Sequence, residues 1–124
     1  MVAKKLKPLR PSLREKKRYV VFEVLSRGSV SESDASNAIW QGCIDLIGQK
    51  GASAAGLAIL HDRWHQPSQS GIVKVAHTKV DEIKTALALI RQAGQNPAIF
   101  RACGVSGMLD KASTGFIKAR LISA

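Results

Sequence analysis

The spacing of apolar residues alternates along this chain between the pattern of a strand and the pattern of a helix. The order of these patterns constrains the fold more than any other feature of the sequence. Alternation with a period of two, typical of a strand, occurs where Val20, Phe22 and Val24 share one face. Spacings of three and four residues, typical of a buried helix face, follow it. The full order is strand, helix, strand, strand, helix, strand, over residues 17–25, 35–47, 54–61, 71–77, 80–90 and 98–103. This order predicts an α/β (α+β) fold of the ferredoxin-like or RNA-recognition-motif-like βαββαβ type, with a four-stranded antiparallel sheet and both helices on one face.

Polar residues and glycines mark the expected ends of the two helices. Ser31 stands three residues before Asp34, a variant of the capping box that starts a helix. Gly48 or Gly51 is expected to end the first helix, and Gly94 the second, because glycine adopts positive φ without strain.

Positive charge is concentrated at the N-terminus. Residues 1–18 hold eight Lys or Arg residues and one Glu, which together account for +7 of the net charge of +10. A basic arm of this kind neutralises phosphates and releases their counterions. We therefore expect a basic arm without fixed structure over residues 1–15, one domain over residues 16–108, and a tail or short helix over residues 109–124.

The face of the sheet that the helices leave uncovered is a candidate contact surface. Alternation places six side chains there: Tyr19, Val21, Ile72, Lys74, Ile99 and Arg101. RNA-recognition motifs stack bases on strand aromatics, but the third strand here offers Ile72 and Lys74 instead. We expect a protein partner on this face rather than RNA bases, and a solvated mixed surface fits the pattern equally well.

The sequence predicts neither a catalytic site nor a metal site. His61 and His65, with Asp62 between them, fall at a strand end and in a loop, where their spacing does not bring them onto one metal ion. No close set of carboxylates could hold two metal ions for phosphodiester cleavage. Cys43 and Cys103 lie in apolar segments and are expected to be small buried side chains in a reducing compartment.

Two further features leave alternatives open. Residues 104–107 (GVSG) predict a tight turn, although their backbone N–H groups could also meet a phosphate. Trp64, in a polar loop, either anchors a partner or covers the edge of the sheet. No apolar run approaches the ~20 residues of a membrane span, and none follows the basic N-terminus as in a secretory signal. We expect a cytoplasmic protein that does not bind membranes.

Four short stretches occur in an order and spacing that resemble one protein family. They are residues 13–19 (LREKKRY), 38–40 (AIW), 71–75 (GIVKV) and 101–107 (RACGVSG). The family is archaeal ribonuclease P protein component 2, a relative of a small protein subunit of the eukaryotic nuclear enzyme. Residues 80–90 are similar to its second helix, so the resemblance spans roughly residues 12–109.

The resemblance implies an accessory, non-catalytic subunit of an RNA-based endonuclease that removes the 5′ leader from precursor tRNA. The RNA would carry the catalysis with magnesium ions, and the protein would bind no cofactor. The implied partners are ribonuclease P RNA, ribonuclease P protein component 3 and a second copy of this chain, with precursor tRNA contacted only indirectly. The residues expected to meet RNA are Arg10, Arg14, Lys16, Lys17 and Arg18, with Ser106 and Gly107 as backbone or hydroxyl contacts.

Two other classes of protein remain open from the sequence. A general or ribosomal RNA-binding module on the same fold would bind RNA without stimulating cleavage of precursor tRNA. A small-ligand regulatory domain of the ACT type would need a pocket between helix and strand, and it would work without the basic arm.

Overall fold

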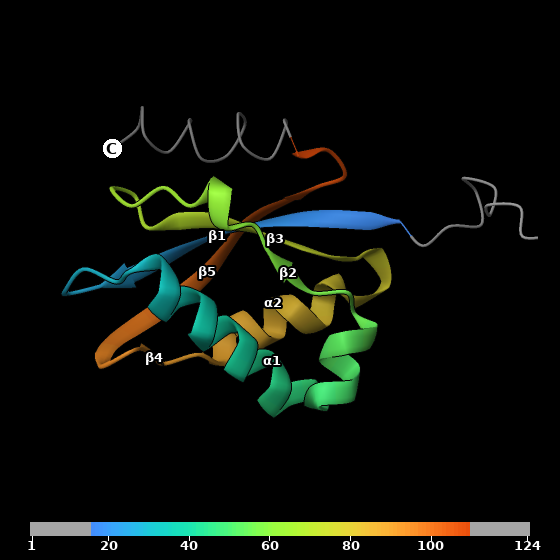
Figure 1. The fold of residues 1–124 in the computed structure, drawn as a ribbon, viewed down its shortest axis with the longest axis horizontal. Coiled ribbons are helices and arrows are strands. Elements are labelled where there is room, and N and C mark those ends of the chain that lie inside the picture. The colour runs from blue at the N-terminus through green and yellow to red at the C-terminus, as the bar shows by residue number, and fades with distance from the viewer. Residues whose placement is uncertain (1–15, 110–124) are drawn as a thin grey trace, which may run out of the picture.

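The computed structural model describes residues 16–109, which form one sheet and two helices (Figure 1). The helices are α1 (Glu32–Ala54) and α2 (Val80–Leu89), and two 3₁₀ turns are η1 (His61–Arg63) and η2 (His77–Lys79). The strands are β1 (Lys17–Ser26), β2 (Ala58–Ile59), β3 (Ser70–Ala76), β4 (Gln92–Ala93) and β5 (Asn96–Ser106). Neighbouring strands are antiparallel in the order β2-β3-β1-β5-β4, so the predicted α+β class is confirmed.

The described sheet has five strands, so the predicted number of four is wrong. Helix α2 ends at Leu89, and Ile90 already has extended backbone with φ −72° and ψ 132°. The chain then forms β4, which pairs with the first two residues of β5. Gly94, at φ +60°, makes the turn between them. The segment expected to finish the second helix is therefore an edge hairpin, and a four-stranded ferredoxin-like plan is not matched strictly.

Helix α1 starts as predicted and runs further than predicted. The hydroxyl of Ser31 accepts a hydrogen bond from the N–H of Asp34 at 3.2 Å, which caps the helix. Gly48 has the left-handed backbone expected of a helix end, with φ +77°, but the helix resumes after it and continues to Ala54. Because the helix uses this length of chain, β2 is only two residues long.

Both helices pack on one face of the sheet, as predicted (Figure 1). Val20, Phe22 and Val24 of β1 point into this core. Its other large buried members include Ile39, Cys43, Val73, Val75, Ile83, Leu87 and Phe100. Leu46 stands seven residues after Ile39 and is therefore expected on the same buried helix face, but it is 39% exposed.

The opposite face of the sheet is covered at its centre, so the expectation of an open face is wrong for Val21 and Ile72. Both residues are 0% exposed and form a second apolar cluster. The side chains packed against them are Tyr19, Leu60, Cys103 and Leu109. Leu60 lies near the end of the strand predicted over residues 54–61, and Leu109 begins the segment predicted only as a tail or short helix. Alternation along β1 and β3 does not show that either side chain folds over this face, so the burial could not be predicted from it.

The rest of the predicted partner face differs from residue to residue in its exposure. Ile99 and Arg101 are exposed, whereas Tyr19 and Lys74 are half-buried. Arg101 Nη2 lies 2.8 Å from Oε1 of Glu23, its partner across the β1–β5 ladder, and this carboxylate is buried. The exposed part of this face is therefore smaller than the sequence suggests.

Candidate nucleic-acid interface

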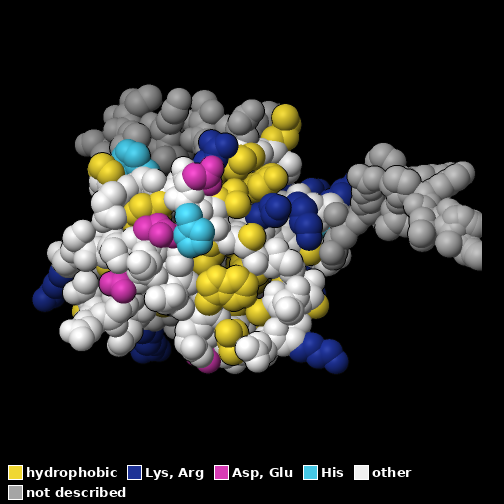
Figure 2. Space-filling model, viewed as in Figure 1, with side chains coloured by type: hydrophobic (Ala, Val, Ile, Leu, Met, Phe, Trp, Pro, Cys, Tyr) yellow, Lys and Arg dark blue, Asp and Glu magenta, His cyan; other side chains and the backbone are white. Residues whose placement is uncertain are grey.

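The start of β1 carries three basic residues on a backbone that neighbouring segments hold in place. The carbonyl of Lys16 accepts a hydrogen bond from the N–H of His77 at 2.8 Å. Lys17 and Arg18 lie in the ladder between β1 and β3. Figure 2 shows Lys and Arg side chains gathered on this side of the molecule. The strand pairing therefore fixes where this positive charge is presented.

The turn between α1 and β2 approaches the same end of the sheet. At Gly56, where φ is +63°, an added Cβ would stand 2.8 Å from Nζ of Lys17. The glycine thus leaves room for the ammonium group. Sequence reasoning missed this residue because it assigned residues 54–61 to a strand, although a glycine in an apolar run often marks a close approach.

The end of β5 lies beside Arg18. A Cβ added at Gly107 would lie 3.6 Å from Nη1 of Arg18, and that nitrogen donates a hydrogen bond to the Lys17 carbonyl at 3.0 Å. Ser106 stands opposite Tyr19 in the ladder, in a register that shifts by one residue of β5 between the pairs made by Phe22 and Val21.

The hydroxyl of Ser106 is used within the turn that follows β5. It donates to the carbonyl of Met108 at 3.0 Å and accepts from the N–H of the same residue at 3.1 Å. The structure therefore brings together five of the seven residues expected to meet RNA: Lys16, Lys17, Arg18, Ser106 and Gly107. Arg10 and Arg14 lie outside the described residues.

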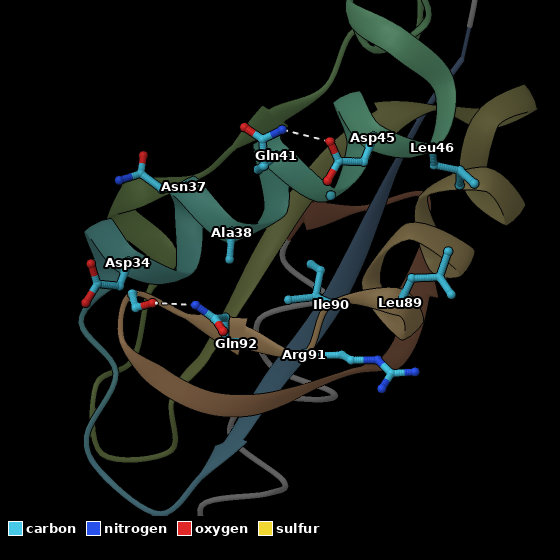
Figure 3. A pocket seen from close by; sticks show the side chains of 12 residues that line it. Asp34, Asn37, Ala38, Gln41, Asp45, Leu46, Leu89, Ile90, Arg91 and Gln92 are labelled. Carbon is cyan, nitrogen blue, oxygen red and sulfur yellow. Dashed lines mark hydrogen bonds between the residues drawn. The ribbon is translucent and has the colours of Figure 1, made fainter.

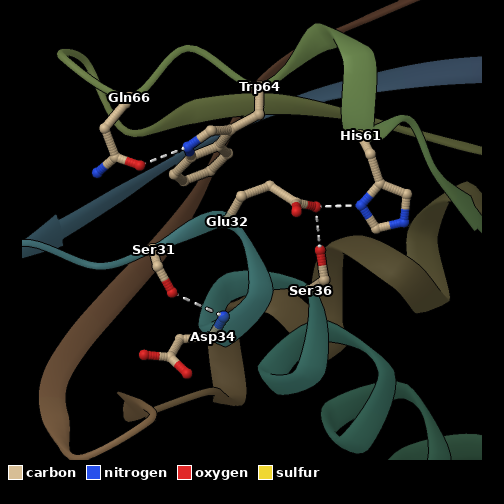
Figure 4. A network of polar contacts seen from close by, with 7 residues as sticks. All are labelled: Ser31, Glu32, Asp34, Ser36, His61, Trp64 and Gln66. Carbon is tan, nitrogen blue, oxygen red and sulfur yellow. Dashed lines mark hydrogen bonds and ion pairs between the residues drawn. The ribbon is translucent and has the colours of Figure 1, made fainter.

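A polar network ties the start of α1 to η1 (Figure 4). Glu32 accepts a hydrogen bond from Ser36 at 2.7 Å and pairs with Nδ1 of His61. Burial alone would raise the pKa of Glu32, but the hydrogen bonds from Ser36 and His61 and the charge of His61 hold it below its usual range. Within residues 16–109, no three His, Cys, Asp or Glu side chains are grouped so that they could hold a metal ion.

Trp64 and the two cysteines are packing residues in this structure. The Trp64 ring lies 6.1 Å from that of Phe22, centroid to centroid, and its Nε1 donates to Gln66 at 2.8 Å (Figure 4). Burial raises the pKa of the Cys43 thiol to about 11, so it stays protonated at neutral pH and behaves as a small apolar side chain. Cys103 is half-buried rather than buried as predicted.

Fold and charge define this chain as a small, basic α+β protein with positive charge gathered at one end of its sheet. No helix in the described part of the chain is long and apolar enough to cross a bilayer. The chain belongs to the Rpp14/Pop5 family, whose model matches residues 18–117.

Individual relatives agree with this assignment. Ribonuclease P protein component 2 of Thermococcus gammatolerans is 34% identical over 113 residues, which cover 91% of this chain and 92% of the relative. The protein of the same name from Methanosarcina barkeri is 33% identical, with 91% and 81% covered. A chain in the cryo-EM structure of yeast ribonuclease MRP has the same fold, with a TM-score of 0.60 at 10% identity over 89% of this chain and 92% of that one. The family resemblance expected from the sequence is confirmed.

Proposed function

We propose that this chain is a non-catalytic protein subunit of ribonuclease P that supports the catalytic RNA as it removes 5′ leaders from precursor tRNA. The observation that carries the proposal is the family match over residues 18–117. The basic end of β1 supports it, because a fixed cluster of positive charge suits a surface that meets phosphates. A cytoplasmic location is part of the same proposal.

The mechanism is electrostatic. RNA phosphates that pack closely in a folded catalytic domain repel one another, and magnesium ions held by the RNA offset that repulsion. Basic side chains placed against the same phosphates reduce the concentration of magnesium that folding needs. In this mechanism the protein binds no metal of its own, and magnesium remains the cofactor of the RNA.

The proposed RNA contacts are the basic residues Arg10, Arg14, Lys16, Lys17 and Arg18, with Ser106 and Gly107 beside them. Since the Ser106 hydroxyl already closes a turn, the backbone of this turn is the better candidate for a phosphate contact. The proposed partners are ribonuclease P RNA and protein component 3, together with a second copy of the chain, and precursor tRNA is met through the complex.

Replacing Lys16, Lys17 and Arg18 together by Gln tests this interface. The triple variant should bind ribonuclease P RNA more weakly, and the slope of log affinity against log salt should fall by roughly one unit for each phosphate that the variant no longer neutralises. The measurement is a filter-binding or anisotropy titration at several salt concentrations, with thermal unfolding to establish that the variant is folded.

A matched control removes the same charge elsewhere. Arg27, Lys84 and Arg91 are all exposed and lie away from the start of β1, and replacing these three by Gln should leave the salt slope nearly unchanged. Equal reductions of affinity and slope in both triple variants would mean that only net charge matters, which contradicts a defined interface at β1.

A further inference from the structure

A groove between the two helices has the chemistry of a protein-docking surface rather than of an RNA surface. It measures about 490 Å³ and lies between α1 and the segment that leads from the end of α2 into β4 (Figure 3). Ala38, Gly42 and Ile90 lie along its inner side, and Leu46 and Leu89 flank it. We call this surface the helix groove.

The helix groove exposes apolar area that the fold itself does not cover. Leu89 is 60% exposed and Leu46 is 39% exposed. Gly42 lets α1 approach closely, since a Cβ there would stand 2.9 Å from Cγ1 of Ile90. Two large exposed leucines beside one groove are typical of a surface that binds an amphipathic segment.

The charge around the helix groove is negative although the whole chain is strongly positive. Asp34 and Asp45 line it, and Asp81 and Glu82 line an adjoining hollow that also includes Leu46. These four are the majority of the seven acidic residues within residues 16–109. Arg91 is the one basic side chain among the residues that line the two hollows.

The acidic residues outside these hollows have partners elsewhere in the described domain. Glu23 pairs with Arg101 and Glu32 with His61, whereas Asp62 has Arg63 at 3.9 Å. Of the four acidic residues that line the two hollows, Glu82 has Lys79 at 3.4 Å. Asp34, Asp45 and Asp81 have no basic partner within the described residues, so the negative charge available to a partner is concentrated at the helix groove and its adjoining hollow. Such a surface repels phosphates and attracts lysine and arginine.

We propose that the helix groove docks a segment of a protein partner in which apolar side chains are flanked by lysine or arginine. The apolar side chains would cover Leu46 and Leu89, and the basic ones would meet Asp34 and Asp45. The identity of that partner rests on the proposed function, which makes protein component 3 of ribonuclease P the probe to use. This assignment differs from the sequence prediction, which put the protein partner on the face of the sheet opposite the helices.

The test compares two double variants by their affinity for purified component 3. In the first, Leu46→Ser and Leu89→Ser remove the apolar flanks of the groove. In the second, Leu25→Ser and Ile99→Ser remove a cross-strand pair on the opposite face of the sheet, with exposures of 48% and 64%. The groove variant should bind component 3 about tenfold more weakly or worse, and the sheet variant should bind nearly as well as the unmodified chain.

Charge gives a second, independent readout. The Asp34→Asn, Asp45→Asn variant keeps the size of both side chains, so it should bind component 3 severalfold more weakly and with less dependence on salt. Affinity for ribonuclease P RNA should stay unchanged in the groove variants, because the groove does not meet phosphates.

Several outcomes would overturn the proposal. They are full affinity of the Leu46→Ser, Leu89→Ser variant for component 3, weakened binding by the sheet variant instead, or no binding of component 3 by the unmodified chain. A change of oligomeric state in the groove variant, with component 3 binding intact, would assign the groove to a second copy of the chain. Stimulation of precursor tRNA cleavage, measured separately, shows whether the proposed function stands when this docking proposal fails.

Discussion

The carboxylate of Glu23 is a buried charge whose ion-pair partner is partly exposed. Its side chain is 3% exposed, whereas that of Arg101, at 2.8 Å, is 55% exposed. Removing one member of a buried pair leaves the other charge in an apolar setting, which destabilises a fold more than the intact pair stabilises it. The exposure of Arg101 reduces this effect below that of a fully buried pair.

Arg101→Gln should therefore lower the free energy of unfolding by about 2 kcal/mol, measured by urea denaturation at neutral pH. Adding Glu23→Gln to it should restore part of that stability, because the buried charge is then removed as well. A double variant that is less stable than Arg101→Gln alone would contradict this account of the pair.

The absence of a side chain at Gly71 leaves room for the rings of Phe22 and Trp64 to pack. A Cβ added at Gly71 would stand 2.8 Å from Cζ of Phe22 and 3.1 Å from Cε3 of Trp64, inside the core. Gly71→Ala should lower the free energy of unfolding by about 2 kcal/mol, as overpacking of a core typically does. Gly107→Ala is the matched control and should change it little, because its nearest neighbour is 3.6 Å away. Equal effects of the two substitutions in denaturant titrations would rule out overpacking as the cause.

At the scale of elements, the link between α1 and η1 should make stability depend on pH. The pKa of Glu32 is lower in the folded protein than its ordinary value of 4.5. A carboxyl group of this kind stabilises the fold above its ordinary pKa, and that contribution disappears as the pH falls through the folded pKa.

Glu32→Gln should therefore destabilise the fold near pH 6 and have less effect near pH 3. Because this contact lies near the surface, the difference should be about 0.5 kcal/mol. Denaturant titrations at the two pH values measure it. The dependence should shrink in a chain that already carries His61→Ala, and an equal effect of Glu32→Gln at both pH values would contradict the account.

Features of the helices and strands that depend on neighbouring residues were predictable from the sequence, and features that depend on distant contacts were not. The start of α1 was predictable because Ser31 caps it through a bond within four residues. The alternation of Val20, Phe22 and Val24 also predicted their burial against the helices. The hairpin at β4 was not predictable, since the backbone of Ile90 leaves the helix although its side chain keeps helical spacing. The burial of Ile72 depends on contacts with distant segments, which no local pattern records.

At the scale of the whole molecule, the described surface has one region of concentrated positive charge and one of concentrated negative charge. Positive charge lies at the start of β1 beside the end of β5, and negative charge lines the groove between the helices. The first was predictable because basic residues run directly into a strand. The second was not, because Asp45 and Asp81 are far apart in sequence and only the packing of α1 on α2 brings their hollows together. Under the two proposals made above, these surfaces would hold an RNA and a protein at once.

The most direct test of that role is cleavage of precursor tRNA by ribonuclease P RNA at limiting magnesium, with this chain and component 3 added together, each added alone, and neither added. We predict that cleavage under these conditions requires both proteins, and that raising the magnesium concentration reduces the requirement. Salt-dependent binding of the RNA without any stimulation of cleavage would contradict the proposed function and assign the chain to general RNA-binding modules.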